Sequence, residues 1–132
     1  MSEIKTAVWP VLRYQDAAEA IRFLVEAFGF VEKAVYARDG GGVDHAELTW
    51  PNGGGVMLSS RSADGDEVRT APGMGSVYLV TDEPDQLHDR AVAAGAKIVR
   101  GLRDEDYGSR GFTARDPEGV VWSFGTYAGE PD

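Results

Sequence analysis

The feature that most constrains the fold of this chain is an internal repeat with an offset of 66 residues, half of its 132-residue length. WPNG at positions 50–53 matches DPEG at positions 116–119, and both are typical of tight turns with proline second and glycine fourth. The same offset places Asp16 on Asp82 and needs no gap. We interpret the chain as a tandem duplication of one supersecondary unit.

Each half contains one segment with helical spacing of apolar residues between a capping residue and a glycine. In the first half Asp16 is a favoured N-cap, and Gly29 marks the end of the helix. In the second half we expect Asp82 to cap a helix that carries Pro84 in its first turn and ends at Gly95. The sequence therefore predicts one helix in each half.

Short apolar runs between turn residues predict four strands in each half. The predicted strands cover residues 6–14, 30–38, 43–50, 55–60, 76–81, 97–102, 110–115 and 120–127. The fold class is α+β, with two tandem βαβββ modules in a single domain over residues 1–132. Module one covers about 6–60 and module two about 74–127. The polar linker at 61–73 is expected to be the most mobile internal segment.

Composition excludes several classes of function. The chain has no cysteine, which rules out disulfides, thiolate metal sites and a cysteine nucleophile. Its net charge of −9 disfavours nucleic acid and favours a neutral or cationic small ligand, although acids that only keep the protein soluble are the simpler explanation. We find no signal peptide and no membrane-spanning run, so we expect a cytoplasmic protein without membrane partners.

A motif near the C-terminus adds a family resemblance. The two modules, together with Y-G-x-R and D-P-x-G-x-x-W-x-F between Tyr107 and Phe124, resemble the vicinal oxygen chelate superfamily, and most closely its glyoxalase/bleomycin-resistance-like group. The resemblance covers about residues 6–127. It implies U-shaped mixed sheets with helices outside and a ligand cavity inside. It also implies a homodimer in which modules of different chains complete each cavity.

The resemblance also implies where a metal would bind. Enzymes of this superfamily carry a His, Glu or Gln ligand on the first and last strand of each module. Those four positions correspond here to Trp9, Met57, Gly75 or Ser76, and Ser123. None of these provides a carboxylate or imidazole, so we expect no metal cofactor. A divalent metal held by other residues remains an open alternative.

The same correspondence assigns the faces of the strands. If Ser123 faces the cavity, strand alternation turns Trp122 towards the helix as a core residue. On the third strand His45 and Glu47 then project together into the cavity. They could orient a proton transfer or hold one metal ion, and the alternative is a solvated strand face.

The predicted ligand-binding residues are Trp9, Met57, Tyr107, Arg110 and Ser123. Aromatic and thioether groups suit a flat or cationic molecule, although these groups could instead fill a closed core. Tyr107 and Arg110 precede the closing hairpin, where they would anchor a ligand or form a structural pair.

The leading hypothesis is metal-independent sequestration of a small molecule such as an antibiotic. The first alternative is a lyase or isomerase of the same fold that acts on a small carbonyl compound, with catalytic His45 and Glu47 and a non-standard or absent metal site. The second is an interaction domain that binds no ligand.

Overall fold

The computed structural model describes residues 6–61 and 71–130. Its elements in chain order are β1 (Val11–Tyr14), α1 (Ala17–Phe23), the π-helical turn η1 (Leu24–Phe28), β2 (Val31–Ala37), β3 (Val43–Thr49), β4 (Gly55–Ser60), β5 (Ser76–Val80), α2 (Pro84–Ala93), β6 (Lys97–Asp104), β7 (Arg110–Arg115) and β8 (Val121–Gly125). Two four-stranded sheets have the orders β1-β4-β3-β2 and β5-β8-β7-β6. In each sheet the strands that come first and last in the chain, β1 with β4 and β5 with β8, pair in parallel, and the other pairs are antiparallel. The predicted α+β fold with two repeated modules is confirmed, while most of the predicted linker lies outside the described residues.

The first strand is shorter than predicted. It begins at Val11, directly after Pro10, rather than at residue 6. Proline has no N–H to donate to a ladder, but its carbonyl can still accept a hydrogen bond, and Met57 N–H donates to Pro10 O at 2.9 Å. The residues before Val11 therefore lead into the sheet without forming strand.

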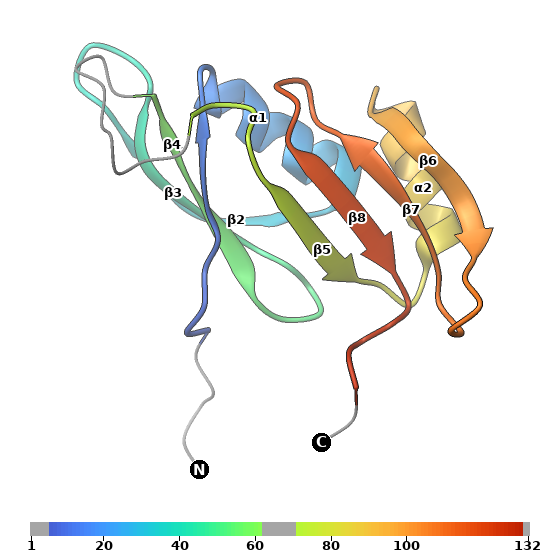
Figure 1. The fold of residues 1–132 in the computed structure, drawn as a ribbon. Coiled ribbons are helices and arrows are strands. Elements are labelled where there is room, and N and C mark those ends of the chain that lie inside the picture. Colours follow the sequence, from blue (N-terminus) through green and yellow to red (C-terminus); the bar gives the residue numbers. More distant parts are fainter. Residues whose placement is uncertain (1–5, 62–70, 131–132) are drawn as a thin grey trace.

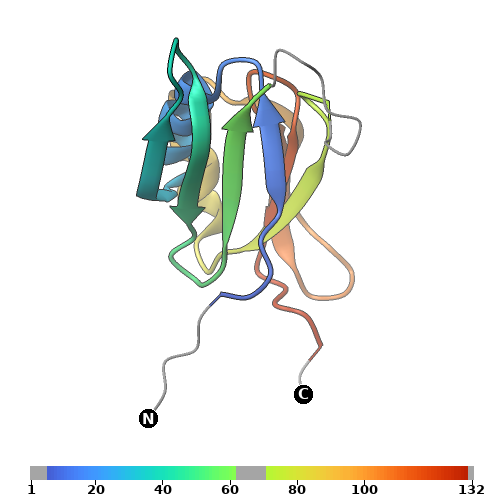
Figure 2. The same ribbon diagram turned by 90° about the vertical axis from the view of Figure 1, so that its left-hand side faces the viewer.

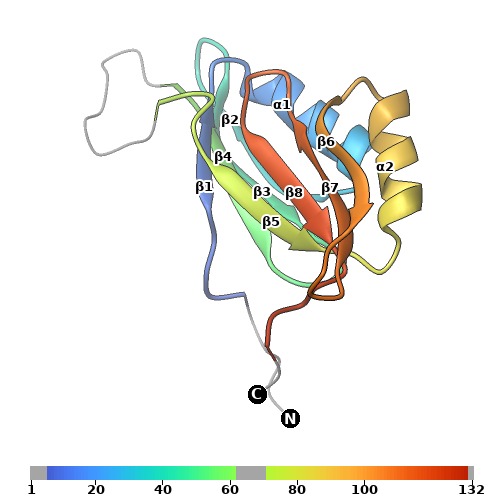
Figure 3. The ribbon, with the colours of Figure 1, turned by 45° about the vertical axis from the view of Figure 1, so that its right-hand side comes forward.

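Both helices lie on the same side of the two sheets, and β1 and β5 run side by side between the modules (Figure 1). Figure 2 shows the sheet of module one from the side opposite the helices, and Figure 3 shows α1 and α2 together behind the strands. We call the side of each sheet that points away from the helices its open face. Trp122 is fully buried on the helical side, which confirms its predicted place in the core.

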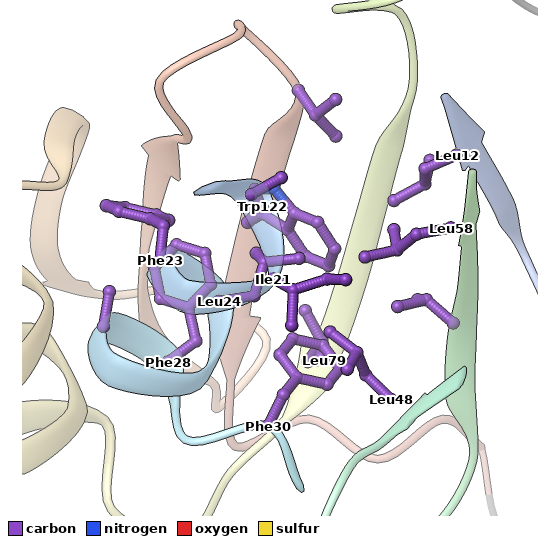
Figure 4. Close-up of a cluster of buried hydrophobic side chains, with 14 of the residues drawn as sticks. Leu12, Ile21, Phe23, Leu24, Phe28, Phe30, Leu48, Leu58, Leu79 and Trp122 are labelled. Atoms are coloured by element: carbon purple, nitrogen blue, oxygen red, sulfur yellow. The ribbon is translucent and has the colours of Figure 1, made fainter. Parts of the chain in front are cut away.

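Aromatic residues from the two modules form one shared core. The ring centroid of Phe28 lies 5.8 Å from that of Trp122 and 4.7 Å from that of Phe124. Phe30 lies 5.0 Å from Trp50 and 5.5 Å from Trp122. Figure 4 shows Ile21 next to Trp122 of module two, with Leu48 and Leu58 of module one on its other side. Because neither module buries these rings alone, we expect the two modules to fold as one cooperative unit.

The two repeated turns reach across to the opposite module. The Trp50 indole N–H donates to Val80 O at 2.9 Å at the end of β5. In the other direction, the Glu118 carboxylate accepts the backbone N–H groups of Gln15 and Asp16 at 2.7 and 2.8 Å. The motif that reveals the duplication is thus also the part that joins its halves.

Asp116 is the most connected residue of these turns, and it is only 4% exposed. One of its oxygens accepts the Tyr14 hydroxyl at 2.5 Å and the Trp122 indole N–H at 2.9 Å. The other accepts the backbone N–H groups of Glu118 and Val120 at 3.0 and 3.1 Å. Four donors therefore stabilise one buried carboxylate where the modules meet.

The predicted helix cap at Asp82 is wrong, whereas the one at Asp16 is confirmed. The Asp16 carboxylate accepts from Glu19 N–H at 3.2 Å. In module two the N-cap is Glu83, and its N–H donates to the Thr81 hydroxyl at 3.1 Å. The second helix therefore begins one residue later than the repeat predicts.

The π-helical turn η1 explains this difference. From N-cap to closing glycine, module one runs from 16 to 29 and module two from 83 to 95, which is one residue fewer. A π turn accommodates one extra residue inside a helix. Because of this extra residue in module one, the two helical segments end at equivalent positions of the repeat, Gly29 and Gly95, which both have positive φ.

Candidate functional site

Strand pairing builds a row of polar side chains across the open face of module two. Tyr78 on β5 is paired with Ser123 on β8, and Ser123 with Thr113 on β7. Thr113 is in turn paired with Arg100 on β6. The Thr113 and Ser123 hydroxyl oxygens are 3.0 Å apart, so one hydroxyl donates to the other. The row therefore has the large side chains of Tyr78 and Arg100 at its ends and two small hydroxyl groups in its centre.

The next row contains two glycines, which make the centre of this face shallow. Gly125 pairs with Val80 on one side and with Gly111 on the other, and Gly111 pairs with Arg103. The result is a hollow of about 190 Å³ with a floor of glycine backbone and small hydroxyls. We call it the module-two hollow; its lining residues are Tyr78, Arg100, Arg103, Glu105, Tyr107, Ser109, Gly111, Phe112, Thr113, Ser123, Phe124 and Gly125.

Tyrosines form one wall of the module-two hollow. The Tyr78 hydroxyl donates to Tyr127 O at 2.7 Å, which holds its ring over the glycine floor. Burial raises the pKa of the Tyr78 phenol, so it remains a neutral donor at physiological pH. The Tyr107 ring packs edge-on against Tyr127 with centroids 5.7 Å apart. Tyr107 and Ser123 therefore both line this hollow, as the sequence predicted for a cavity.

Two arginines and one carboxylate form the opposite wall. Arg103 donates from Nε and Nη2 to the two Glu105 oxygens at 2.7 and 3.3 Å. The Arg100 guanidinium is 4.0 Å from the same carboxylate at its nearest approach. Two positive groups thus share one negative group, which leaves the wall with an excess positive charge.

A larger hollow of about 380 Å³ lies between the modules on the helical side, next to Phe28, Trp50 and Arg90. Arg90 is already used there to join the modules, because it donates to Glu26 O at 2.9 Å and to Val25 O at 3.2 Å. These carbonyls belong to η1, whose end the guanidinium caps. The module-two hollow lies on the open face and contains the Thr113–Ser123 hydroxyl pair and the half-exposed Arg100 guanidinium, so we take that hollow as the candidate site.

The comparisons with known proteins agree with this architecture. Residues 6–124 match the family model of the Glyoxalase/Bleomycin resistance protein/Dioxygenase superfamily. The chain belongs to this superfamily.

Individual relatives give little further detail about activity. The uncharacterized protein Mb0911c of Mycobacterium bovis is 34% identical over 128 residues, which cover 92% of this chain and 84% of that protein. TioX from Micromonospora sp. ML1 is 31% identical with a TM-score of 0.72, covering 90% of this chain and 98% of that chain. A glyoxalase I mutant from Zea mays has a TM-score of 0.73 at 21% identity, covering 96% of this chain and 47% of that chain, and it shows the fold alone.

Within this superfamily fold, Trp9 lies outside the ladder. The strand residue paired with Met57 is Val11, and Met57 is also paired with Glu47 on the open face of module one. Trp9 packs against Gly55, where an added Cβ would lie 2.6 Å from its ring, and its indole N–H donates to Thr6 O. Neither Trp9 nor Met57 is among the described residues that line the module-two hollow, so their predicted contact with a ligand requires the open face of module one.

Arg110 points away from the module-two hollow, towards α2. Its guanidinium donates to both Asp85 oxygens at 2.8 and 3.1 Å and lies 3.4 Å from Asp104. The hydrogen bond from Arg110 lowers the pKa of Asp85. Of the two roles that the sequence left open for Arg110, this geometry favours the structural one, although its partners are Asp85 and Asp104 rather than Tyr107.

His45 and Glu47 lie together on the open face of module one. His45 Nε2 is 2.9 Å from Glu47 Oε2, and the imidazole stacks on Tyr36 with centroids 6.1 Å apart. Among residues 6–61 and 71–130, no three His, Asp or Glu side chains gather as a metal site would require. That the protein uses no metal cofactor remains a prediction. The His45–Glu47 pair by itself is suited to orienting one proton.

Sequence reasoning missed Tyr78, Arg100, Arg103 and Glu105 as lining residues. Alternation from Ser76, one of the positions that the resemblance places in the cavity, could have found Tyr78 two residues further along the same strand. The arginines could not be placed in this way, because register shifts in the pairing of β6 with β7 change the faces of the β6 side chains.

In the described part of the chain, no helix is long and apolar enough to cross a membrane.

Proposed function

We propose that this chain is a metal-independent small-molecule binding protein that holds a flat compound, such as an antibiotic, in the module-two hollow. The observation that carries this proposal is the floor of Thr113 and Ser123 between the side chains of Tyr78 and Arg100. A planar molecule can lie on such a floor while tyrosine packs against its edge and hydroxyls orient it. Sequestration requires only binding energy, which these groups supply without a metal.

We further propose that the site is completed in a homodimer. The open faces carry apolar groups that a partner would cover, since Val11 is 58% exposed and Tyr78 is 48% exposed. A partner's module one would also bring Trp9 and Met57 close to a ligand in the module-two hollow. Membership of the superfamily supports binding of a small molecule, and the dimer gives these two predicted residues a role.

Filling the floor of the module-two hollow is expected to weaken binding. We would titrate 2-naphthamide, a flat neutral probe, and follow its Kd by calorimetry and its position by amide NMR. Leucine in Ser123→Leu occupies the space above the floor, so we expect at least a tenfold increase in Kd, about 1.4 kcal/mol. Ser76→Leu, at an exposed position of β5 outside this hollow, is the matched control.

The proposal also predicts where the NMR signals move. Shifts should concentrate at β7 and β8 in the wild type and disappear in Ser123→Leu. Equal affinity in both variants, or shifts confined to module one, would show that the compound binds elsewhere.

A second function is favoured by the short contact between His45 and Glu47. A carboxylate that orients an imidazole is a common general acid–base arrangement, suited to lyase or isomerase chemistry on a small carbonyl compound.

Protein purified without chelators would be tested by elemental analysis and by thermal-shift titration with Ni²⁺, Zn²⁺, Mn²⁺ and Mg²⁺. Stabilisation by one metal that fails in His45→Ala and Glu47→Ala, at unchanged metal-free stability, would make the enzyme the better explanation; we expect no shift.

A further inference from the structure

The charge of the module-two hollow is opposite to that of the whole protein. The chain carries a net charge of −9. The described residues that line this hollow, however, include two arginines, Arg100 and Arg103, and one acidic residue, Glu105. The net charge of a protein does not determine the potential in one concave site, where neighbouring charges dominate. The cationic ligand expected from composition therefore does not suit this face.

Arg100 provides the positive charge that remains available. Arg103 already engages both oxygens of Glu105, whereas Arg100 approaches that carboxylate only to 4.0 Å. The Arg100 side chain is 51% exposed, so a ligand can reach it. A guanidinium presents several N–H donors in one plane, which matches the two oxygens of a carboxylate.

The neighbours of Arg100 can add a second interaction with the same anionic group. Arg100 lies directly opposite Thr113 on the paired strand, and the Thr113 hydroxyl is hydrogen-bonded to the Ser123 hydroxyl. This hydroxyl pair has two protons and uses one between its oxygens, which leaves one O–H to donate to a ligand. A guanidinium from β6 and a hydroxyl donor from β7 thus converge on one side of the module-two hollow.

From this juxtaposition we propose that the module-two hollow selects flat compounds that carry an acidic group, a carboxylate or similar oxyanion, which Arg100 binds. The aromatic body lies over Ser123 and Thr113, between Tyr78 and Arg100, and the acidic group points to β6. This inference rests on the proposed binding function and specifies its ligand class.

A matched series of probes tests the inference. The series 2-naphthoate, 2-naphthamide and 2-naphthylmethylammonium keeps one ring system and changes only the charge. We expect naphthoate to bind the wild-type protein at least about tenfold more tightly than naphthamide, as is typical for hydrogen bonds to a charged group, and the ammonium probe most weakly. Raising the salt concentration should weaken naphthoate binding alone.

Variants of Arg100 assign the preference to one side chain. Arg100→Gln should remove the preference for naphthoate and leave the Kd of naphthamide unchanged, while Arg100→Lys should retain part of it. Arg22→Gln removes the same charge from an exposed position of α1, on the helical side, and should keep the full preference. Melting temperatures of all variants would identify any loss of affinity that results from unfolding.

The possible failures are distinguishable. Equal binding of naphthoate and naphthamide by the wild-type protein, or an equal loss of preference in Arg22→Gln, would overturn this inference and leave the proposed binding function in place. Tightest binding of the ammonium probe would also overturn it. If none of the three probes binds, the proposed function fails together with the inference.

Discussion

Replacing Asp116 with alanine is expected to lower the free energy of unfolding by about 4 kcal/mol, because several buried donors lose their acceptor at once. Tyr14, Trp122 and two backbone N–H groups all donate to this carboxylate. Tyr14 and Trp122 are fully buried, so water cannot easily replace the lost acceptor. Urea denaturation monitored by circular dichroism would measure the change. A loss below about 1 kcal/mol would contradict the role assigned to Asp116.

Tyr14→Phe separates one of these hydrogen bonds from the rest. At neutral pH we expect a smaller loss, about 1–3 kcal/mol, since three donors to Asp116 remain. Burial, reinforced by the Asp116 carboxylate, raises the pKa of Tyr14 far above its ordinary value of 10.0.

Above pH 10 the unfolded chain therefore loses the Tyr14 proton while the folded protein keeps it. The stability that Tyr14 contributes is fully present below pH 10. It then falls by about 1.4 kcal/mol per pH unit in the wild type relative to Tyr14→Phe. Parallel pH profiles of the two proteins between pH 10 and 12 would contradict this.

Gly111→Ala is expected to be the most damaging single-methyl addition, costing at least about 3 kcal/mol. A Cβ at this position would lie 1.9 Å from Phe124 O and 2.9 Å from the Gly125 Cα. Both are backbone atoms of β8, so relief of the clash requires β7 and β8 to separate. Thermal unfolding would detect the loss, and hydrogen exchange would locate it in β7 and β8.

Gly101→Ala is the matched control, because it adds the same methyl group to the neighbouring strand β6. No atom lies within 4 Å of its Cβ position. We therefore expect its stability to change by less than about 1 kcal/mol, with a small gain from the lower entropy of the unfolded chain. Equal losses in the two variants would indicate that glycine is needed for backbone flexibility rather than for close strand approach.

The repeat predicted much of the fold and part of the candidate site. Strand alternation placed Trp122 in the core and Ser123 on the open face, because side chains of a strand alternate whatever the strand packs against. The same reasoning failed for the cap of the second helix. The ungapped offset concealed two compensating differences, a later start of α2 and an extra residue in η1. A comparison of turns alone cannot detect such a pair.

The sequence by itself determined the features that depend on neighbouring residues: the two modules, the turns that connect consecutive strands, and the alternation of faces within each strand. Only the tertiary structure decided which side chains meet across strands. It joined Tyr14 to Asp116, 102 residues apart, and placed Arg100 opposite Thr113 while turning Arg110 towards α2. The physical reason is that register shifts and π turns absorb single residues at small local cost, and each absorbed residue redirects the side chains that follow.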